Sequence, residues 1–199
     1  MLFVACILLL AFTGIGPACA AEAIEEQQND EEMNQDVQDT QQSTSLIIYF
    51  SHTGNTFELA KHIQELTGAD IFQIEPVIPY PDEYDACVAQ ARAELADEVW
   101  PELQNHVDDI ASYDTIYLGY PIWISTIPRP VATFLAEHDL EGKIIAPFCT
   151  YGGGGISNSV TDITALVPQA IVTDGFGVTG PQASEAKDAV AAWLEEIEQ

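Results

Sequence analysis

The sequence predicts an α/β fold in which one parallel β-sheet is covered by helices on both faces. Three observations lead to this prediction. Short apolar runs alternate along the chain with stretches whose apolar residues recur every three or four positions. The runs are apolar throughout rather than at every second residue, which is typical of strands buried on both faces. Hydrophobic residues make up 47% of the 199 residues, which is enough for one sizeable core.

Five strands are predicted from the apolar runs. They span residues 46–50, 71–74, 115–118, 144–150 and 170–172. Pro147 falls inside the fourth run and has no N–H for a strand ladder, so a local bulge is expected there. The stretches between the strands predict helices, marked by apolar residues at helical spacing: Leu59, Ala60, Ile63 and Leu66; Tyr84, Cys87, Val88, Ala91 and Leu95; Val131, Phe134 and Leu135; Val160, Ile163, Ala165 and Leu166; and Val190, Trp193, Leu194 and Ile197.

Residues 1–20 are expected to be an export signal and not part of the fold. Residues 1–12 are almost wholly apolar but too few to span a membrane comfortably, and Ala18-Cys19-Ala20 has the small residues that signal peptidase prefers. The alternative is a lipoprotein signal, in which Cys19 carries a lipid anchor and provides the one membrane contact that we expect. Both alternatives place the mature protein outside the cytoplasmic membrane, as a secreted, periplasmic or lipid-anchored protein.

Residues 21–45 are expected to form a disordered linker ahead of a single domain spanning residues 46–199. The linker holds eight acidic residues and no Lys or Arg, so it cannot bury enough apolar surface to fold. The whole chain is similarly one-sided, with 32 acidic residues, five Lys and Arg, and a formal net charge of −27. Such a surface excludes nucleic acid and anionic lipid as partners and favours a basic protein partner.

Three unusual connections follow predicted strands, at the edge where open α/β sheets bind their ligands. The first is Ser51-His52-Thr53-Gly54-Asn55-Thr56, between the first strand and the first helix. Its side chains and the free N–H groups of a helix start can all donate to one anion. The loop lacks the lysine of a Walker motif, which leaves a monophosphate site or a plain helix cap as the alternatives.

This loop resembles the FMN-phosphate loop of the flavodoxin family, in which Ser-x-Thr-Gly-Asn-Thr follows the first strand. The resemblance covers roughly residues 46–199, because two later segments occur in the family's order. It implies a doubly wound, five-stranded parallel sheet of order 2-1-3-4-5 and a non-covalently bound FMN. The cofactor-binding residues that it implies in this loop are Ser51, His52, Thr53, Gly54, Asn55 and Thr56.

The second segment, Gly119-Tyr120-Pro121-Ile122-Trp123, follows the third strand. An aromatic side chain on a proline-containing loop can stack on a flat heterocycle. The resemblance implies that Trp123 covers one face of the flavin ring, with Pro121 and Ile122 beside it. Ordinary core packing of Trp123 is the alternative.

The third segment, Thr150-Tyr151-Gly152-Gly153-Gly154-Gly155, follows the fourth strand. Its glycines permit a close approach of the backbone to a ligand, although a simple hinge is the alternative. The resemblance implies that Thr150 and Tyr151 lie at the flavin, with Tyr151 flanking the ring. It also implies that Gly152 and Gly153 offer backbone donors to the edge of the ring.

One departure from the well-studied flavodoxins affects the expected redox behaviour. Those proteins have a glycine close after the tryptophan of the second segment, whereas Ile124, Ser125 and Thr126 follow Trp123 here. The resemblance therefore implies weak stabilisation of the half-reduced flavin.

Other chemistry is sparse in the sequence. The four histidines have no partners at the spacing of metal ligands, so no metal site is expected. Cys87 and Cys149 could pair in an exported protein, but their predicted positions on a helix and a strand favour two buried free thiols.

Together these expectations describe an FMN-binding redox protein that transfers electrons in the manner of a flavodoxin. A basic redox partner protein fits its acidic surface. One alternative is an FMN-dependent oxidoreductase that takes hydride from NAD(P)H and reduces a quinone or a similar acceptor, although no basic cluster for a nicotinamide phosphate is visible. A second alternative is a binding module that uses the same fold without redox work.

Overall fold

The structure, a computed structural model, describes residues 44–197. The expected export signal and the expected linker lie outside these residues, apart from the last two residues of the linker. The first strand begins at Ser45, one residue earlier than predicted. The strands are β1 (Ser45–Tyr49), β2 (Asp70–Gln73), β3 (Thr115–Pro121), β4 (Ile144–Tyr151), β5 (Ile171–Val172) and β6 (Phe176–Thr179). The helices are α1 (Asn55–Thr67), α2 (Tyr84–Ala96), α3 (Arg129–Glu137), α4 (Ser159–Leu166) and α5 (Lys187–Ile197), with short 3₁₀ turns η1 (Ile110–Ser112) and η2 (Gly180–Glu185).

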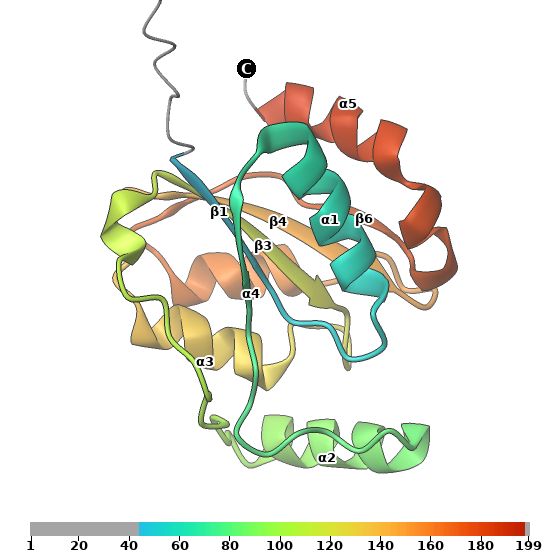
Figure 1. The fold of residues 1–199 in the computed structure, drawn as a ribbon. Helices are drawn as coiled ribbons and strands as arrows, with labels where there is room; N and C mark the ends of the chain where they lie inside the picture. The colour runs from blue at the N-terminus through green and yellow to red at the C-terminus, as the bar shows by residue number, and fades with distance from the viewer. Residues whose placement is uncertain (1–43, 198–199) are drawn as a thin grey trace, which may run out of the picture. The chain divides into compact units, whose positions relative to one another are not determined.

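The strands form one parallel sheet in the order β2-β1-β3-β4-β5, as the resemblance implied. The two faces of the sheet are buried by different helices. Ile48 and Leu118 point into a core with α3 and α4, whereas Ile47 and Tyr117 point into a core with α1 and α5. Figure 1 shows the same arrangement, with α1 and α5 on one side of the sheet and α3 and α4 on the other. The predicted α/β class is therefore confirmed.

β4 runs unbroken through Pro147, so the bulge expected there lies instead in the strand that faces it, which is divided in two. β5 pairs with Ile144 and Ile145, and β6 resumes the pairing opposite Phe148. Between these two pairings, residues 173–175 of the one strand face only residues 146 and 147 of β4. Thr173 N still donates to Ile145 O at 2.9 Å, but the nitrogen of Pro147, the next group in that parallel ladder, carries no hydrogen to continue it. The second half of this strand, β6, was not predicted from the sequence.

Residues 74–105 leave the sheet after β2 and carry α2 along their path. The two arms of this excursion pair with each other, since Val77 N donates to Glu102 O and Gln104 N donates to Glu75 O, both at 2.8 Å. α2 begins where the Glu83 carboxylate accepts hydrogen bonds from the N–H groups of Asp85 and Ala86, which is a typical N-cap. Figure 1 shows α2 set apart from the sheet, beyond α3. The pairing of the two arms fixes where α2 lies.

Two further features of the described residues bear on the expectations. Cys87 and Cys149 are both buried and both free, so the expected free thiols are confirmed. Between residues 44 and 197, no helix has the length and apolar character needed to cross a bilayer.

Candidate cofactor site at the carboxyl edge of the sheet

The structure brings the three predicted segments together at one edge of the sheet. They follow β1, β3 and β4, which are consecutive neighbours in the strand order. Backbone hydrogen bonds continue past the strand ends: Phe50 N donates to Gly119 O at 2.9 Å, and Ile122 N donates to Thr150 O at 2.8 Å. Their register places Pro121 opposite Thr150. A ligand lying across this edge could therefore touch all three segments.

The loop after β1 leaves backbone donors free at the start of α1. α1 begins at Asn55 after Gly54, whose φ of 88° is the left-handed conformation that favours glycine. No side chain caps the helix at Gly54, and a Cβ there would meet no atom within 4 Å. The first helix-type bond of α1 runs from Glu58 N to Gly54 O at 3.1 Å, so the helix itself provides no acceptor for the N–H groups of Asn55 and Thr56. Free N–H groups facing open space at a helix start form an anion site.

The side chains of this loop are partly engaged within the protein. Ser51 Oγ accepts a hydrogen bond from Phe57 N at 3.3 Å, so the expected alternative of a helix cap is present in part. Asn55 Nδ2 donates to Thr53 Oγ1 at 3.2 Å, which leaves the Thr53 hydroxyl hydrogen free. Thr56 is buried, and its hydroxyl lies 2.9 Å from the hydroxyl of Thr150. This buried pair joins the first predicted segment to the third.

Trp123 lies at the start of a tight turn that the sequence did not predict. Trp123 and Thr126 exchange two backbone hydrogen bonds, each 3.0 Å long. Ile124 and Ser125 between them have φ values of 50° and 65°. Two-residue turns with positive φ at both positions usually contain Asn and Gly, and a β-branched residue there is an outlier. The turn therefore stores backbone strain beside the candidate site, of order 1–3 kcal/mol per residue.

Three aromatic rings hold the half-buried indole of Trp123 edge-on. The ring centroids of Tyr80, Phe50 and His52 lie 4.8, 5.4 and 5.7 Å from it, at interplanar angles of 78°, 90° and 82°. Edge-on contacts of this kind fix the plane of a ring. His52 is therefore placed at the tryptophan as well as in the loop after β1. Trp123 also packs against the hydrophobic core on the α3 and α4 face.

Tyr80 and Glu94 belong to this site, and sequence reasoning missed both. Buried Tyr80 donates its hydroxyl hydrogen to the Glu94 carboxylate, which also accepts from Gln90 Nε2 at 2.9 Å. Burial, reinforced by Glu94, raises the pKa of Tyr80 well above its usual value. Tyr80 stands between two prolines in the excursion before α2, a position whose local pattern indicates a loop. Its tertiary role has no local signature.

The glycine-rich segment provides the open side of the site. Cβ atoms built at Gly152 and Gly153 would meet nothing within 4 Å, and neither residue has a positive φ. No contact within the protein therefore requires glycine at these two positions, whereas close approach of a ligand would. Tyr151 ends β4, and its ring lies against Gly177 of β6, where a Cβ would come within 3.1 Å of the ring. Tyr151 packs on the same core as Trp123.

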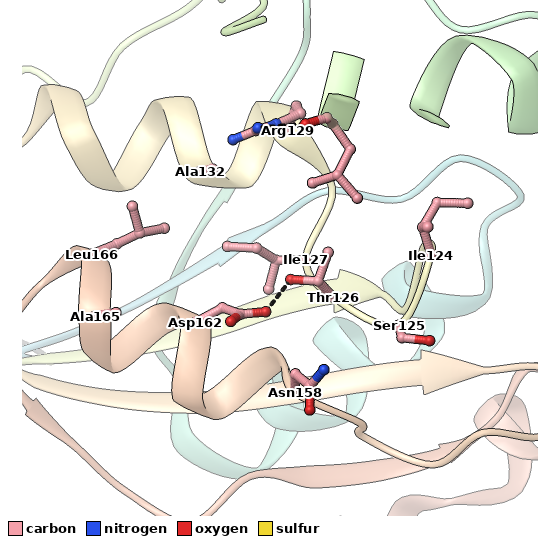
Figure 2. Close-up of a pocket in the computed structure, with 11 residues that line it drawn as sticks. Ile124, Ser125, Thr126, Ile127, Arg129, Ala132, Asn158, Asp162, Ala165 and Leu166 are labelled. Carbon is pink, nitrogen blue, oxygen red and sulfur yellow. Dashed lines mark hydrogen bonds between the residues drawn. The ribbon is translucent and has the colours of Figure 1, made fainter. Parts of the chain in front are cut away.

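Two cavities adjoin the turn after Trp123. One, of about 210 Å³, lies between α2, the loop after β1 and Trp123. The other, of about 470 Å³, is shown in Figure 2 and is lined by residues 124–127, α3 and α4. There Asp162 accepts a hydrogen bond from the Thr126 hydroxyl, and Arg129 Nε is buried without a partner in the described chain. Of the sequence-predicted site residues, His52, Thr53 and Trp123 line the first cavity and none lines the second.

Comparison with known proteins decides the family. A family model described as flavodoxin matches residues 44–197, which are all of the described residues. The chain belongs to the flavodoxin family. A comparison with curated proteins gives no significant match.

Among solved structures, this flavodoxin-family chain is similar to candidate flavoproteins of two Bacteroides species. The protein from Bacteroides eggerthii is 30% identical, with a TM-score of 0.68 over 78% of this chain and 98% of that one. The protein from Bacteroides uniformis is 29% identical, with a TM-score of 0.69 over 77% and 98%. A Lactobacillus acidophilus flavoprotein in complex with FMN is 20% identical over 71% of this chain and 96% of that one, with a TM-score of 0.57, a likeness of fold alone.

In the described part of the chain, no group of three or more His, Cys, Asp or Glu residues is placed to hold a metal ion. The candidate site is thus built from hydroxyls, backbone N–H groups and aromatic rings. This set of groups suits a flat ligand that carries one phosphate, which is the chemistry of a flavin mononucleotide.

Proposed function

We propose that this protein binds FMN at the carboxyl edge of its sheet and transfers electrons. The observation that carries the proposal is the junction of three elements: the unpaired N–H groups of Asn55 and Thr56, the indole of Trp123, and the open backbone at Gly152 and Gly153. FMN, when bound, supplies a ring that takes up one or two electrons. The protein's own contribution is to hold the phosphate, fix the plane of the ring and limit its contact with water.

The phosphate-binding part can be assigned atom by atom. The N–H groups of Asn55 and Thr56 would donate to phosphate oxygens at the positive end of α1. The Thr53 hydroxyl has a free hydrogen and is exposed, so it can add a further donor. The loop contains no Lys or Arg, so these neutral donors and the helix dipole would provide most of the stabilisation.

The electron-carrier function is supported by where the few cations lie. Lys61 pairs with Glu58 and Lys187 pairs with Glu65, both at 2.7 Å, while Lys143 donates to Tyr113 O at 2.5 Å. Arg129 donates to Leu95 O at 3.2 Å. A 2′-phosphate or pyrophosphate of a nicotinamide cofactor would need a cluster of cations near the ring, and of the five Lys and Arg residues only Arg129 lines a cavity beside the turn after Trp123. The acidic surface instead suits transient docking on a basic redox partner, with association that slows as salt is added.

The FMN assignment is tested by titrating the purified protein with FMN and with riboflavin while following flavin fluorescence. We expect FMN to bind far more tightly, because each hydrogen bond to a charged phosphate contributes about 1.5–3 kcal/mol. The Ser51→Ala, Thr53→Ala double variant should lose at least about tenfold in FMN affinity. Thr161→Ala, at an exposed threonine of α4, is the matched control. Equal binding of both flavins by the wild type, with an unchanged double variant, would reduce the loop to a helix cap.

Whether NADH or NADPH can reduce the flavin is tested on the FMN-loaded protein. We expect NADH and NADPH to leave the visible spectrum unchanged over minutes, whereas dithionite bleaches it. Rapid bleaching by either nicotinamide cofactor would replace the carrier by the alternative, an NAD(P)H-dependent oxidoreductase.

We also propose export of this protein. The apolar run of residues 1–12 and the Ala18-Cys19-Ala20 sequence support removal of the first 20 residues or lipidation at Cys19. Intact-mass measurement on protein from the native host should show a shortened N-terminus or a diacylglycerol adduct. An unmodified Met1 on a cytoplasmic protein would overturn this part.

A further inference from the structure

A cavity of about 210 Å³ lies on the α2 side of Trp123. Its lining comes from two sources that are far apart in the sequence. His52 and Trp123 belong to the segments assigned to FMN, whereas Tyr84, Cys87, Val88 and Ala91 belong to α2. The glycine-rich segment does not contribute to it. The cavity is therefore a separate space that shares one wall with the proposed flavin site.

The cavity exists because α2 presents small side chains on the face where a core helix usually presents large ones. Tyr84, Cys87, Val88 and Ala91 stand at positions i, i+3, i+4 and i+7, the spacing of a buried helix face, although Tyr84, the one large member, is 77% exposed. Cys87 and Ala91 are the buried members of this set, and both are short. Leu or Phe at either position would occupy the space instead. The sequence pattern thus indicates a core-facing stripe, and the structure shows that the stripe does not fill its core.

The walls of the cavity are held in place by contacts on either side of it. The pairing between residues 75–77 and 102–104 fixes the base of the excursion, and Glu83 caps α2 at its start. The hydrogen bond from Tyr80 to Glu94 ties the segment before α2 to the helix itself. Tyr80 also contacts Trp123, which is the opposite wall. The space is therefore fixed by the fold and does not depend on one mobile side chain.

The chemistry of the lining selects its occupant. Most of the surface is apolar, and the indole of Trp123 and the ring of His52 suit a flat ring. His52 can donate from a ring N–H, so a ring that carries an acceptor oxygen is favoured. Asp82 also borders the space, and the protein has a formal net charge of −27. Both negative charges disfavour binding of an anion. A dry cavity of about 150 Å³ is known to hold benzene. This one is larger and partly open to solvent, so a compound larger than benzene can enter it with part of the molecule outside.

We propose that this cavity binds a small, flat, uncharged ring compound with carbonyl oxygens, of the quinone class. This inference rests on the proposed function only where it treats Trp123 as part of the flavin site. The cavity itself is present whether or not FMN binds. Bound there, the ring lies between α2 and Trp123, and one of its carbonyl oxygens accepts a hydrogen bond from His52. The Cys87 thiol in the wall does not attack such a guest readily, because burial raises the pKa of this thiol and keeps it protonated.

The test uses 2,3-dimethyl-1,4-naphthoquinone, whose ring positions are blocked against addition of thiols. Binding is measured by equilibrium dialysis, first on the FMN-free protein and then on protein saturated with FMN. We expect saturable binding that Ala91→Leu weakens at least tenfold, while Ala93→Leu, the same change at an exposed position of α2, leaves it unchanged. Naphthoquinone-2-sulfonate, which carries a negative charge, should bind at least tenfold more weakly than the neutral probe.

The variants also separate this proposal from the FMN proposal. FMN affinity should be the same in wild type, Ala91→Leu and Ala93→Leu, because α2 does not contribute to the phosphate loop. If FMN fails to bind while the quinone binds and responds to Ala91→Leu, the proposed function fails and the cavity proposal stands. Val88→Phe fills the same space from a half-buried position and replaces Ala91→Leu should that variant unfold. Unchanged quinone binding in a folded filling variant, or equal binding of the sulfonate, would overturn the proposal.

Discussion

The buried hydroxyl pair of Thr56 and Thr150 gives the sharpest test of how the candidate site is built. Thr56 is 1% exposed and Thr150 is 4% exposed, and their oxygens lie 2.9 Å apart. Thr56→Val keeps the side-chain shape but removes one hydroxyl, which leaves the Thr150 hydroxyl buried without its partner. A buried polar group left unpaired costs about 1–3 kcal/mol. For a domain of this size the melting temperature should fall by roughly 2–4 °C per kcal/mol.

The double variant measures how far the two hydroxyls depend on each other for their contribution to stability. Thr150→Val should cost about as much stability as Thr56→Val, for the same reason. Replacing both hydroxyls leaves no orphan, so Thr56→Val, Thr150→Val should be much less destabilised than the sum of the two single variants, with a coupling of about 1–2 kcal/mol. Urea unfolding followed by circular dichroism measures all four proteins. Thr161→Val, at an exposed position of α4, should stay within about 0.5 kcal/mol of wild type.

FMN titration of the same four proteins adds an independent measurement. If the Thr56 hydroxyl also donates to the phosphate, the double variant should regain stability but stay at least about tenfold weaker in FMN affinity. Strict additivity of the two stability losses would show that the hydroxyls do not depend on each other, and the reasoning from their 2.9 Å separation would be wrong. Full FMN affinity in the double variant would exclude the Thr56 hydroxyl, though not the Thr56 N–H, as a donor to the phosphate.

Three further outcomes follow from the described contacts. Gly119→Ala should cost about 1–3 kcal/mol, because its Cβ would lie 2.3 Å from Cζ of Phe148, while Gly152→Ala, with open space around it, should change the free energy of unfolding little; similar urea midpoints for both would contradict this. Ser125→Gly should raise stability by about 0.5–1 kcal/mol, since Ser125 has a φ of 65°, and a lower melting temperature would show that its side chain matters more than its backbone. Burial raises the pKa of Cys149 to about 12. The unfolded chain therefore loses this proton first, and stability should fall between about pH 9 and pH 12 by roughly 1.4 kcal/mol per pH unit for this group, a slope that Cys149→Ala should reduce in urea titrations.

The strands were predictable because the physics that forms them is local, whereas their order came only from the resemblance to the flavodoxin family. Continuous apolar runs placed all five predicted strands to within a few residues of their observed bounds, and the alternation with helices indicated a parallel sheet. β6 was missed because its sequence, Phe176-Gly-Val-Thr179, lacks a run of large apolar residues. β6 pairs with β4 beyond the interruption opposite Pro147. The sequence indicated an irregularity at Pro147 but not that a second strand follows it.

The candidate site was predictable to the extent that it follows strand ends. The loop after β1, Trp123 and the glycine-rich segment all meet, since parallel strands end at a common edge. Tyr80 and Glu94 were not predictable, because their contact depends on the pairing of residues 75–77 with residues 102–104. That pairing closes a long excursion between two elements, and no local periodicity encodes such a contact. The expected weak stabilisation of the half-reduced flavin stays a prediction.

The turn at Ile124 and Ser125 shows where local reasoning failed most clearly. The absence of glycine after Trp123 argues against positive φ in this turn, and yet both residues adopt it. Each left-handed residue costs of order 1–3 kcal/mol. Against this cost stand the two backbone bonds between Trp123 and Thr126, a bond from Asn158 N to Ser125 O at 3.2 Å, and the bond from Thr126 to Asp162. At about 1 kcal/mol for each neutral bond, and more for the carboxylate, these contacts offset the strain.

Two of these four contacts come from α4 and the residue before it, not from the turn itself. The conformation next to Trp123 is therefore set by the packing of α4 against the carboxyl edge of the sheet. Removing the Asp162 carboxylate would act on the plane of Trp123 without touching it, because the turn would lose a contact that holds its strained backbone. The bond from Asn158 uses its backbone N–H, which most substitutions keep. The position of the tryptophan thus depends on long-range contacts, whereas the phosphate loop after β1 depends on its own sequence. This difference explains why the sequence identified that loop readily and gave no indication of the turn.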